Sequence, residues 1–168
     1  GKETDGYMLP LSANKKENAD KTDGWFMGTI DGQYHTISNL RICRQNGKYT
    51  GLVGYLGNET LTTPTIRNLG LINLKMEAKK SCGAFAGVCF GTVENCFATG
   101  TIKAKEAVGG LVGKCEGELR NCVSYMKVKG KSLVGGLVGN ILGGAVENCY
   151  VGGSVTVSGG KALSLIHI

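Results

Sequence analysis

The sequence has few proline, aromatic and charged residues, and this composition limits the possible fold classes. Among 168 residues only two are Pro, 7% are aromatic and 19% are charged. Gly is abundant, with 28 residues, and because Gly weakens helix interiors this composition is not that of a helical protein. A hydrophobic content of 42% is enough to build a core, which excludes a disordered chain. The composition therefore predicts many short strands joined by tight turns.

Long hydrophobic segments are also missing. No run of about 18 apolar residues occurs, so we expect no membrane insertion. The chain opens on Gly1 and not on Met and shows no signal-peptide pattern, so we expect any signal peptide to lie upstream of this fragment. Its last residues, Leu163–Ile168, resemble the translated end of a transposase sequencing adapter, so His167 receives no functional weight. We expect a fragment of a longer protein, with a polar lead-in at 1–25, a repeat domain at 26–162 and an artefact at 163–168.

A repeated glycine block is the main signal in the sequence. Gly-Leu-Val-Gly occurs at Gly51–Gly54, Gly110–Gly113 and Gly136–Gly139, and a degenerate copy occupies Ala84–Gly87. The closing glycines of these blocks are 33, 26 and 26 residues apart. The longer first step predicts a loop insertion around Thr60–Pro64.

Two further elements recur with the same period. One is an apolar residue, any residue, Asn, and then Leu or Cys; its asparagines are 29, 27, 26 and 27 residues apart. The other is a short alternating strand. The asparagines are Asn39, Asn68, Asn95, Asn121 and Asn148; the strands are Thr101–Lys103, Lys127–Lys129 and Ser154–Thr156.

Each unit of about 26 residues thus holds about three short strands and three bends, with no helical periodicity. One unit cannot bury its own apolar residues, but stacked units bury a continuous core with equivalent residues about 4.8 Å apart. A β-propeller blade would need about 40–50 residues. We therefore predict an all-β parallel β-helix of about five rungs.

Aligning the units places most of the cysteines in columns that elsewhere hold Leu, Ile or Val, so a thiol acts there as a small apolar core residue. Only Cys43 falls outside these columns. We expect Cys96, Cys122 and Cys149 to be buried, reduced thiols. The predicted columns are Leu40, Leu69, Cys96, Cys122 and Cys149; Leu56, Cys89, Cys115 and Ile141; and Cys82, Val108 and Val134.

The asparagine column predicts a ladder at a bend, because Asn tolerates left-handed backbone and stacked amides can bond to one another. The residue before each Asn alternates in sign on successive rungs. Exposed pairs of this kind contribute only about 0.2–1 kcal/mol, so we expect them to disfavour register slips. These residues are Arg67, Glu94, Arg120 and Glu147.

The repeated Gly-Gly-Leu-Val-Gly followed by Asn-Cys resembles the GLUG-motif family over roughly residues 26–157, and Phe26–Gly32 with His35–Leu40 is similar to the opening rung of such arrays. The resemblance implies a right-handed β-helix from a bacterial secreted or cell-surface protein. Family members include adhesin-like proteins and non-catalytic regions of immunoglobulin A-cleaving metallopeptidases. The resemblance carries no catalytic residues to this chain, and its degenerate copy at Ala84–Gly87 departs from the core motif.

Patterns of known catalytic or binding chemistry fail on inspection. Gly109–Lys114 lacks the spacing of a phosphate-binding loop, so we expect no nucleotide and no cofactor. The cysteines lack the close pairs of a zinc site, and His-Glu-x-x-His is absent. Asp31 is expected to serve turn geometry and His35 to be structural. We therefore predict that the chain is not an enzyme.

The leading hypothesis is a structural or adhesin-like repeat module of a larger extracellular or cell-surface protein. One alternative is a module that binds glycan or another anionic polymer, since the net charge is +6 and lysines recur beside the third strand of successive units. The other is a non-catalytic fragment of a polysaccharide-active or peptidase enzyme. The candidate binding residues are Lys103, Lys105, Lys127, Lys129 and Lys131.

Overall fold

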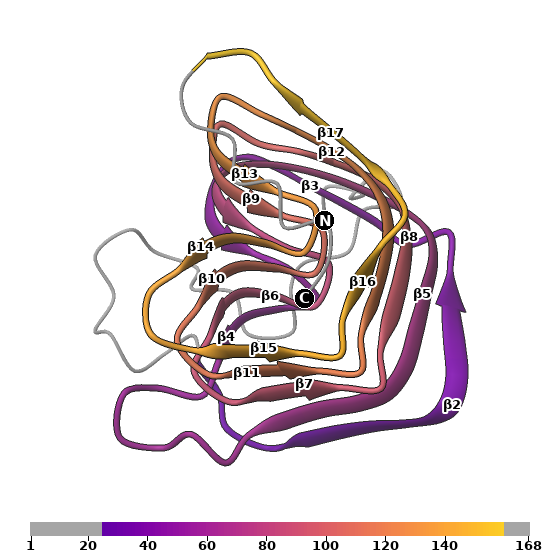
Figure 1. Ribbon diagram of the computed structural model, residues 1–168, viewed down its shortest axis with the longest axis vertical. Coiled ribbons are helices and arrows are strands. Elements are labelled where there is room, and N and C mark those ends of the chain that lie inside the picture. The colour runs from indigo at the N-terminus through magenta and orange to yellow at the C-terminus, as the bar shows by residue number, and fades with distance from the viewer. Residues whose placement is uncertain (1–24, 160–168) are drawn as a thin grey trace, which may run out of the picture.

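The computed structural model describes residues 25–159, and within that range every regular element is a β-strand. The strands stack in parallel as a solenoid of about five turns (Figure 1), and equivalent positions on successive turns are ~27 residues apart in the sequence. From β14 (Val138–Ile141) the chain passes through β15 (Ala145–Glu147) to β16 (Tyr150–Val151), running counter-clockwise in Figure 1 as it approaches the viewer. This path is right-handed, so the predicted right-handed parallel β-helix is confirmed.

One face of the solenoid is a five-stranded sheet in the order β1-β4-β6-β10-β14. It begins with Trp25 and Phe26, which pair with Tyr55 and Leu56. Trp25, assigned from the sequence to the lead-in, is thus part of the first rung, whereas 1–24 and the adapter-like end lie outside the described residues. The strands preceding β14 are β1 (Trp25–Phe26), β4 (Val53–Leu56), β6 (Ala86–Cys89) and β10 (Val112–Cys115).

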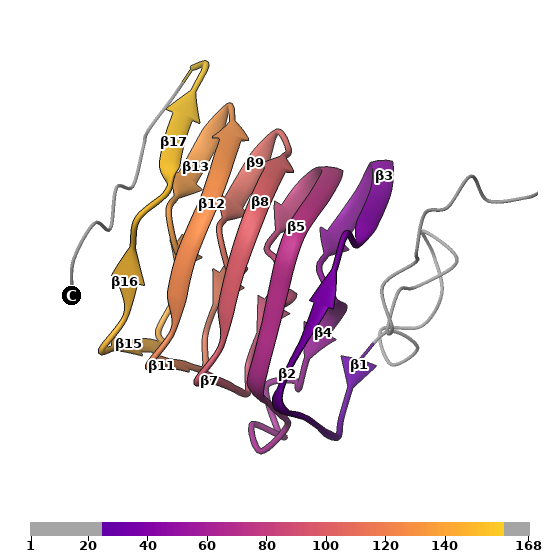
Figure 2. The ribbon, with the colours of Figure 1, turned by 90° about the vertical axis from the view of Figure 1, so that its right-hand side faces the viewer.

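The other twelve strands form a continuous sheet that bends around the remaining faces (Figure 2). Its long members run through a corner without interruption, whereas later rungs divide the same path into shorter strands. They are β2 (Thr29–Ser38), β3 (Arg41–Thr50), β5 (Thr65–Cys82), β7 (Thr92–Glu94), β8 (Phe97–Lys103), β9 (Glu106–Gly109), β11 (Glu118–Arg120), β12 (Val123–Gly130), β13 (Ser132–Gly135), β17 (Ser154–Val157), and the β15 and β16 already given.

The glycine blocks and the Gly that precedes some of them lie where the backbone passes close to itself and to the next rung. A Cβ on Gly109 would overlap the carbonyl oxygens of Val112 and Leu137, so only Gly fits there. The following Leu and Val side chains, such as Leu111 and Val112, are fully buried. The repeated block is therefore a tight corner followed by two core residues.

The predicted loop insertion is confirmed. Residues 57–64 separate β4 from β5, whereas only two residues separate β6 from β7. Asn58 organises this loop, because its Oδ1 accepts hydrogen bonds from the backbone N–H of Thr60 at 2.9 Å and of Leu61 at 2.7 Å. The extra residues lie outside the stack and leave its register intact.

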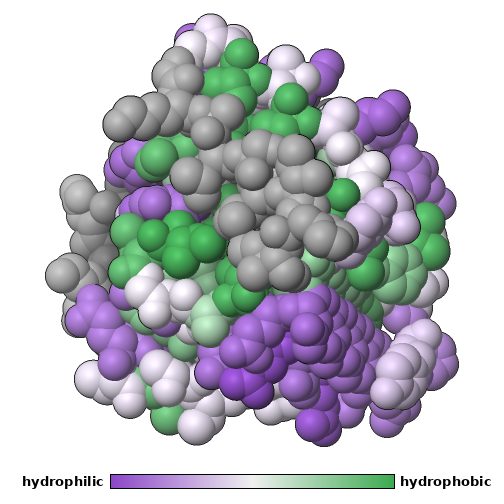
Figure 3. Space-filling model, in the orientation of Figure 1, coloured by the Kyte–Doolittle hydropathy of each residue, from purple (hydrophilic) through white to green (hydrophobic). Residues whose placement is uncertain are grey.

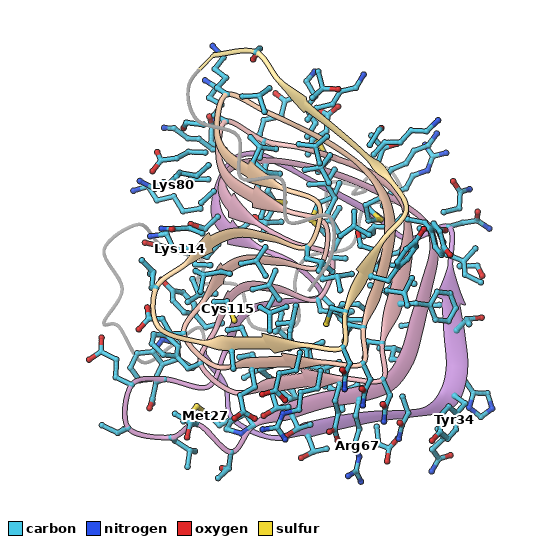
Figure 4. All side chains as sticks on the ribbon, in the orientation of Figure 1. Met27, Tyr34, Arg67, Lys80, Lys114 and Cys115 are labelled. Atoms are coloured by element: carbon cyan, nitrogen blue, oxygen red, sulfur yellow. The ribbon has the colours of Figure 1, made fainter. Side chains whose placement is uncertain are left out.

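The core consists of apolar columns that run along the solenoid axis, and the strand register confirms two of the predicted columns in full. Each also gains a member at its start: Phe26 precedes Leu56, and Thr50 precedes Cys82. Figure 4 shows Cys115 pointing into this interior. The confirmed columns are Leu56, Cys89, Cys115 and Ile141, and Cys82, Val108 and Val134.

The third predicted column holds from Leu69 onward but does not include Leu40. The register places Leu69, Cys96, Cys122 and Cys149 on successive rungs. Leu40 instead lies beside Leu74, because its carbonyl accepts a 2.9 Å bond from the N–H of Lys75. A register shift between Asp31 and His35 moves the first rung relative to the next, and this displacement makes the assignment of Leu40 wrong.

Six of the seven cysteines are buried, and all seven are free thiols; only Cys43 is partly exposed. Cys96, Cys122 and Cys149 are 2%, 0% and 4% exposed, so these thiols lie inside the core as the sequence predicts. Burial raises the pKa of Cys82. A hydrogen bond to Cys122, together with burial, raises the pKa of Cys149. Both thiols are therefore held in the unreactive protonated form.

An asparagine ladder forms at one corner of the solenoid. The second face, formed by β7, β11 and β15, meets there the third face, formed by β8, β12 and β16. The Nδ2 of Asn121 donates to the Oδ1 of Asn95, and the Nδ2 of Asn95 donates to Asn68, each at 3.2 Å. These residues have left-handed backbone, with φ between 52° and 53°. Asn148 follows Glu147, the rung partner of Arg120, and has φ 49°. The amides of Asn68, Asn95 and Asn121 each donate toward the preceding rung.

Asn39 is not part of this ladder, and its predicted place there is wrong. Its Oδ1 accepts a 2.7 Å bond from Asn73, one corner further along the rung. The same register shift in β2 is the cause. Instead Asp31 ends the ladder by accepting a 3.1 Å bond from Asn68.

Opposite charges alternate next to the ladder. The register places Asp31, Arg67, Glu94, Arg120 and Glu147 in one column. The Arg67–Asp31 and Arg120–Glu147 pairs are 3.0 and 3.7 Å long. Figure 3 shows the resulting hydrophilic surface at the corner between β15 and β16, and Figure 4 shows Arg67 pointing outward there. A one-rung slip would place like charges together, which supports the proposed role in register.

Thiol reactivity tests the core assignment. In the native protein we expect a small alkylating reagent to modify Cys43 rapidly and the six buried thiols slowly, because the reagent needs an accessible thiolate. After denaturation the reagent should modify all seven thiols. Mass spectrometry of the modified peptides measures this, and a Cys43→Ser variant should lose the fast phase. Rapid native labelling of Cys96, Cys122 and Cys149, or disulfides among them, would contradict the column.

Acid titration tests the end of the ladder. Hydrogen bonds from the Gln33 N–H, then from Asn68 and Arg67, hold the pKa of Asp31 below its ordinary value of 3.8. The folded pKa therefore lies below the unfolded one, so the stabilisation is present above pH 3.8 and is lost as pH falls through the folded pKa. Denaturant unfolding of Asp31→Asn should show lower stability at pH 7 and a weaker decline on acidification.

A Glu59→Gln variant, which changes an exposed acid in the 57–64 loop, is the control and should follow the wild type. An identical acid dependence in Asp31→Asn and wild type would show that Asp31 does not stabilise the ladder.

Candidate functional site

The candidate lysines lie on or at the end of the third face of the solenoid. This face contains β8 and β12 and is turned toward the viewer in Figure 2. Burial alternates along β12, where Met126 and Val128 are fully buried while Lys127 and Lys129 are exposed. In β8, Ile102 is buried and Lys103 is exposed. The predicted outward direction of Lys103, Lys127 and Lys129 is therefore confirmed.

These lysines fall into separate columns. Lys103 and Lys129 are rung partners, preceded by Glu77 and followed by Thr156. The rung partners of Lys127 are Thr101 and Ser154, so Lys127 has no lysine directly above or below it.

A further lysine column stands at the next bend. The N–H of Lys131 donates to the carbonyl of Lys105, and the N–H of Lys105 donates to Lys79, each at 3.0 Å. Three lysines thus occupy equivalent positions on three successive rungs. Stacked at about 4.8 Å, like charges repel one another unless solvent or an anion compensates. The sequence identified Lys105 and Lys131 but missed Lys79, which lies within the long β5 strand.

The two lysine columns flank a groove of about 540 Å³ that crosses the rungs. Small residues, Ala78, Ala104 and Gly130, line the groove between the lysine columns. The groove therefore follows the solenoid axis with cations on both sides. Its other lining residues are Gln45, Asn46, Glu77, Lys103, Lys105, Lys129, Lys131, Thr156 and Ser158.

We call the surface formed by these lysine columns and their neighbours the lysine face. Among residues 25–159 its lysines form no ion pair, whereas Lys80, beyond the bend, pairs with Glu106 at 2.8 Å. Glu77 is the one acid that lines the groove. The face thus carries uncompensated positive charge. It consists of Lys75, Lys79, Lys103, Lys105, Lys127, Lys129 and Lys131.

Asp31 and His35, the other polar candidates, make local structural contacts. Asp31 accepts bonds from Arg67 and Asn68 and from the N–H of Gln33 at 2.9 Å, which is the predicted turn role. The Nδ1 of His35 lies 3.0 Å from the Gly32 carbonyl. In the described part of the chain no three His, Cys, Asp or Glu side chains gather as a metal site would require. Nor do residues 25–159 include an apolar helix of membrane-spanning length.

Comparison with known proteins agrees with the repeat architecture. Residues 130–156 match the family model described as "The GLUG motif". The chain is 39% identical over 85 residues to Halomucin from the halophilic archaeon Haloquadratum walsbyi (strain DSM 16790 / HBSQ001). The match covers 51% of this chain and 1% of that protein, so the chain spans a very small part of this relative. No solved structure matches the chain significantly.

The matched segment 130–156 corresponds to one rung of the solenoid, from the end of β12 through β13 to β17. It contains the Gly136–Gly139 block and the Asn148-Cys149 pair on which the resemblance rested. The chain is therefore a β-solenoid repeat module that carries the GLUG motif.

Proposed function

We propose that this chain is a rigid, adhesin-like repeat module of a larger extracellular or cell-surface protein and that its role is structural and not catalytic. The carrying observation is that successive rungs repeat the same buried columns along one axis, as expected of a rigid spacer that displays a surface. The likeness to a short stretch of Halomucin, a large surface protein, supports this setting.

Cell labelling tests the proposed location. An antibody raised against folded 25–159 should label intact cells of the source organism or detect the protein in the culture medium. A cytoplasmic protein serves as the control for cell integrity. Labelling that requires permeabilised cells, with none in the medium, would overturn the proposal.

The groove favours a second role, the binding of a linear anionic polymer such as an acidic polysaccharide. A polymer lying along the axis would meet Lys103 and Lys129 on one side and Lys105 and Lys131 on the other, with Lys79 stacked next to Lys105. Its affinity should fall steeply with salt because exposed charges are screened within about 10 Å at 0.1 M.

Retention on heparin or alginate columns tests this role. Changing Lys103, Lys127 and Lys129 to Gln should lower the salt concentration of elution markedly, and so should changing Lys79, Lys105 and Lys131. The matched control changes Lys48, Lys80 and Lys114, which lie outside the groove, and removes the same charge. An equal loss in the control, or no retention of the wild type at low salt, would refute a specific groove.

A further inference from the structure

Next to the lysine face, three aromatic side chains lie on the same sheet surface. Tyr125 and Tyr150 are 52% and 44% exposed, which is high for large aromatic residues in an ordered sheet. Their ring centroids are 6.0 Å apart with an interplanar angle of 61°. Phe97 lies two rungs before Tyr150 in the same column, with Val123 between them. We call Phe97, Tyr125 and Tyr150 the aromatic row.

Glycines on neighbouring rungs make room for these rings. A Cβ on Gly152 would overlap the Tyr125 ring, and a Cβ on Gly70 would overlap the Phe97 ring. Both rings therefore pack against bare backbone, which fixes their positions on the sheet. A favourable edge-to-face contact explains the Tyr125–Tyr150 pair but not the exposure of both rings.

Positive charge stands directly beside the row. Lys127 follows Tyr125 by two residues on the same face of β12, a separation of about 7 Å. The rung partners of Lys127 are Thr101 and Ser154, whose hydroxyl groups can donate and accept hydrogen bonds. Within about 7 Å the surface thus offers an aromatic ring, a cation and hydroxyl groups.

We propose that the aromatic row and Lys127 form a subsite for the sugar rings of an acidic polysaccharide whose uronate units carry the carboxylate on the stacked ring. The inference rests on the proposed binding of an anionic polymer and names its class. A uronate matches the short distance from Tyr125 to Lys127, because its carboxylate is attached to the sugar ring itself. In single-stranded nucleic acid the charged phosphate is separated from the stacking base by the ribose.

The proposal predicts that the aromatic row discriminates between anionic polymers. Binding of alginate oligosaccharides, long-chain polyphosphate and oligo-dT is compared by calorimetry at low salt. Changing Tyr125 and Tyr150 to Ala should weaken alginate binding about tenfold or more and leave polyphosphate binding within about twofold. The tenfold loss corresponds to about 1.4 kcal/mol. Changing Lys103, Lys127 and Lys129 to Gln should weaken both.

Two controls separate recognition from folding. Tyr34→Ala removes a tyrosine that is 80% exposed at the corner of the first rung, on β2 and outside the aromatic row (Figure 4), so it should not alter alginate binding. The double Phe variant, Tyr125→Phe with Tyr150→Phe, keeps the rings and should retain most of the affinity even if the Ala variant is less stable.

The outcomes are distinct for the two proposals. Equal losses for alginate and polyphosphate in the Ala variant, or unchanged alginate binding, would overturn the sugar subsite while the anionic-polymer role stands. Tighter binding of oligo-dT than of alginate, lost in the Ala variant, would also overturn it in favour of nucleic acid. Failure of the wild type to bind any of the three polymers would overturn both.

Discussion

The parallel backbone pairing between successive rungs is the interaction on which the rest of the structure depends. Each strand presents N–H and C=O groups that only the next rung satisfies, as between β8 and β12, which remain paired over seven consecutive residues. This pairing fixes the register, and the register places each side chain directly above its equivalent. The packing and the charge interactions of a side chain are thus set mainly by the equivalent residues on the rungs before and after it.

Inside the solenoid, stacking equivalent apolar side chains stabilises the fold. A fully buried Leu, Ile or Val side chain stabilises by about 1.5–3 kcal/mol, and here such residues recur in the core of every rung from β4 onward. Cys fits the same columns because it is small and apolar, as at Cys89 and Cys115 between Leu56 and Ile141. Parallel stacking points neighbouring thiols in one direction and does not favour the geometry of a disulfide. The thiols therefore contribute packing rather than cross-links.

On the surface the same stacking brings equivalent residues together. The resulting charge interactions differ between the column beside the asparagine ladder and the lysine face. Beside the asparagine ladder the charges alternate from Asp31 to Glu147, so stacking is neutral or favourable at about 0.2–1 kcal/mol per pair. On the lysine face, Lys79, Lys105 and Lys131 are stacked without such compensation. Folding gains nothing from that arrangement, so these charges are left to solvent or, under the proposed function, to an anionic polymer.

The sequence by itself determined the repeat, the parallel stack and most core columns, because a period of about 26 residues leaves few other ways to bury one apolar set per unit. It also identified the ladder from Asn68 to Asn121 and the outward lysines of β8 and β12. It misplaced Asn39 and Leu40, since the shift between Asp31 and His35 lies in strand pairing and leaves the motif itself unchanged. Only the tertiary structure stacked Lys79 with Lys105 and Lys131 and set Tyr125 against Gly152, because residues far apart in the chain become neighbours only when the rungs stack.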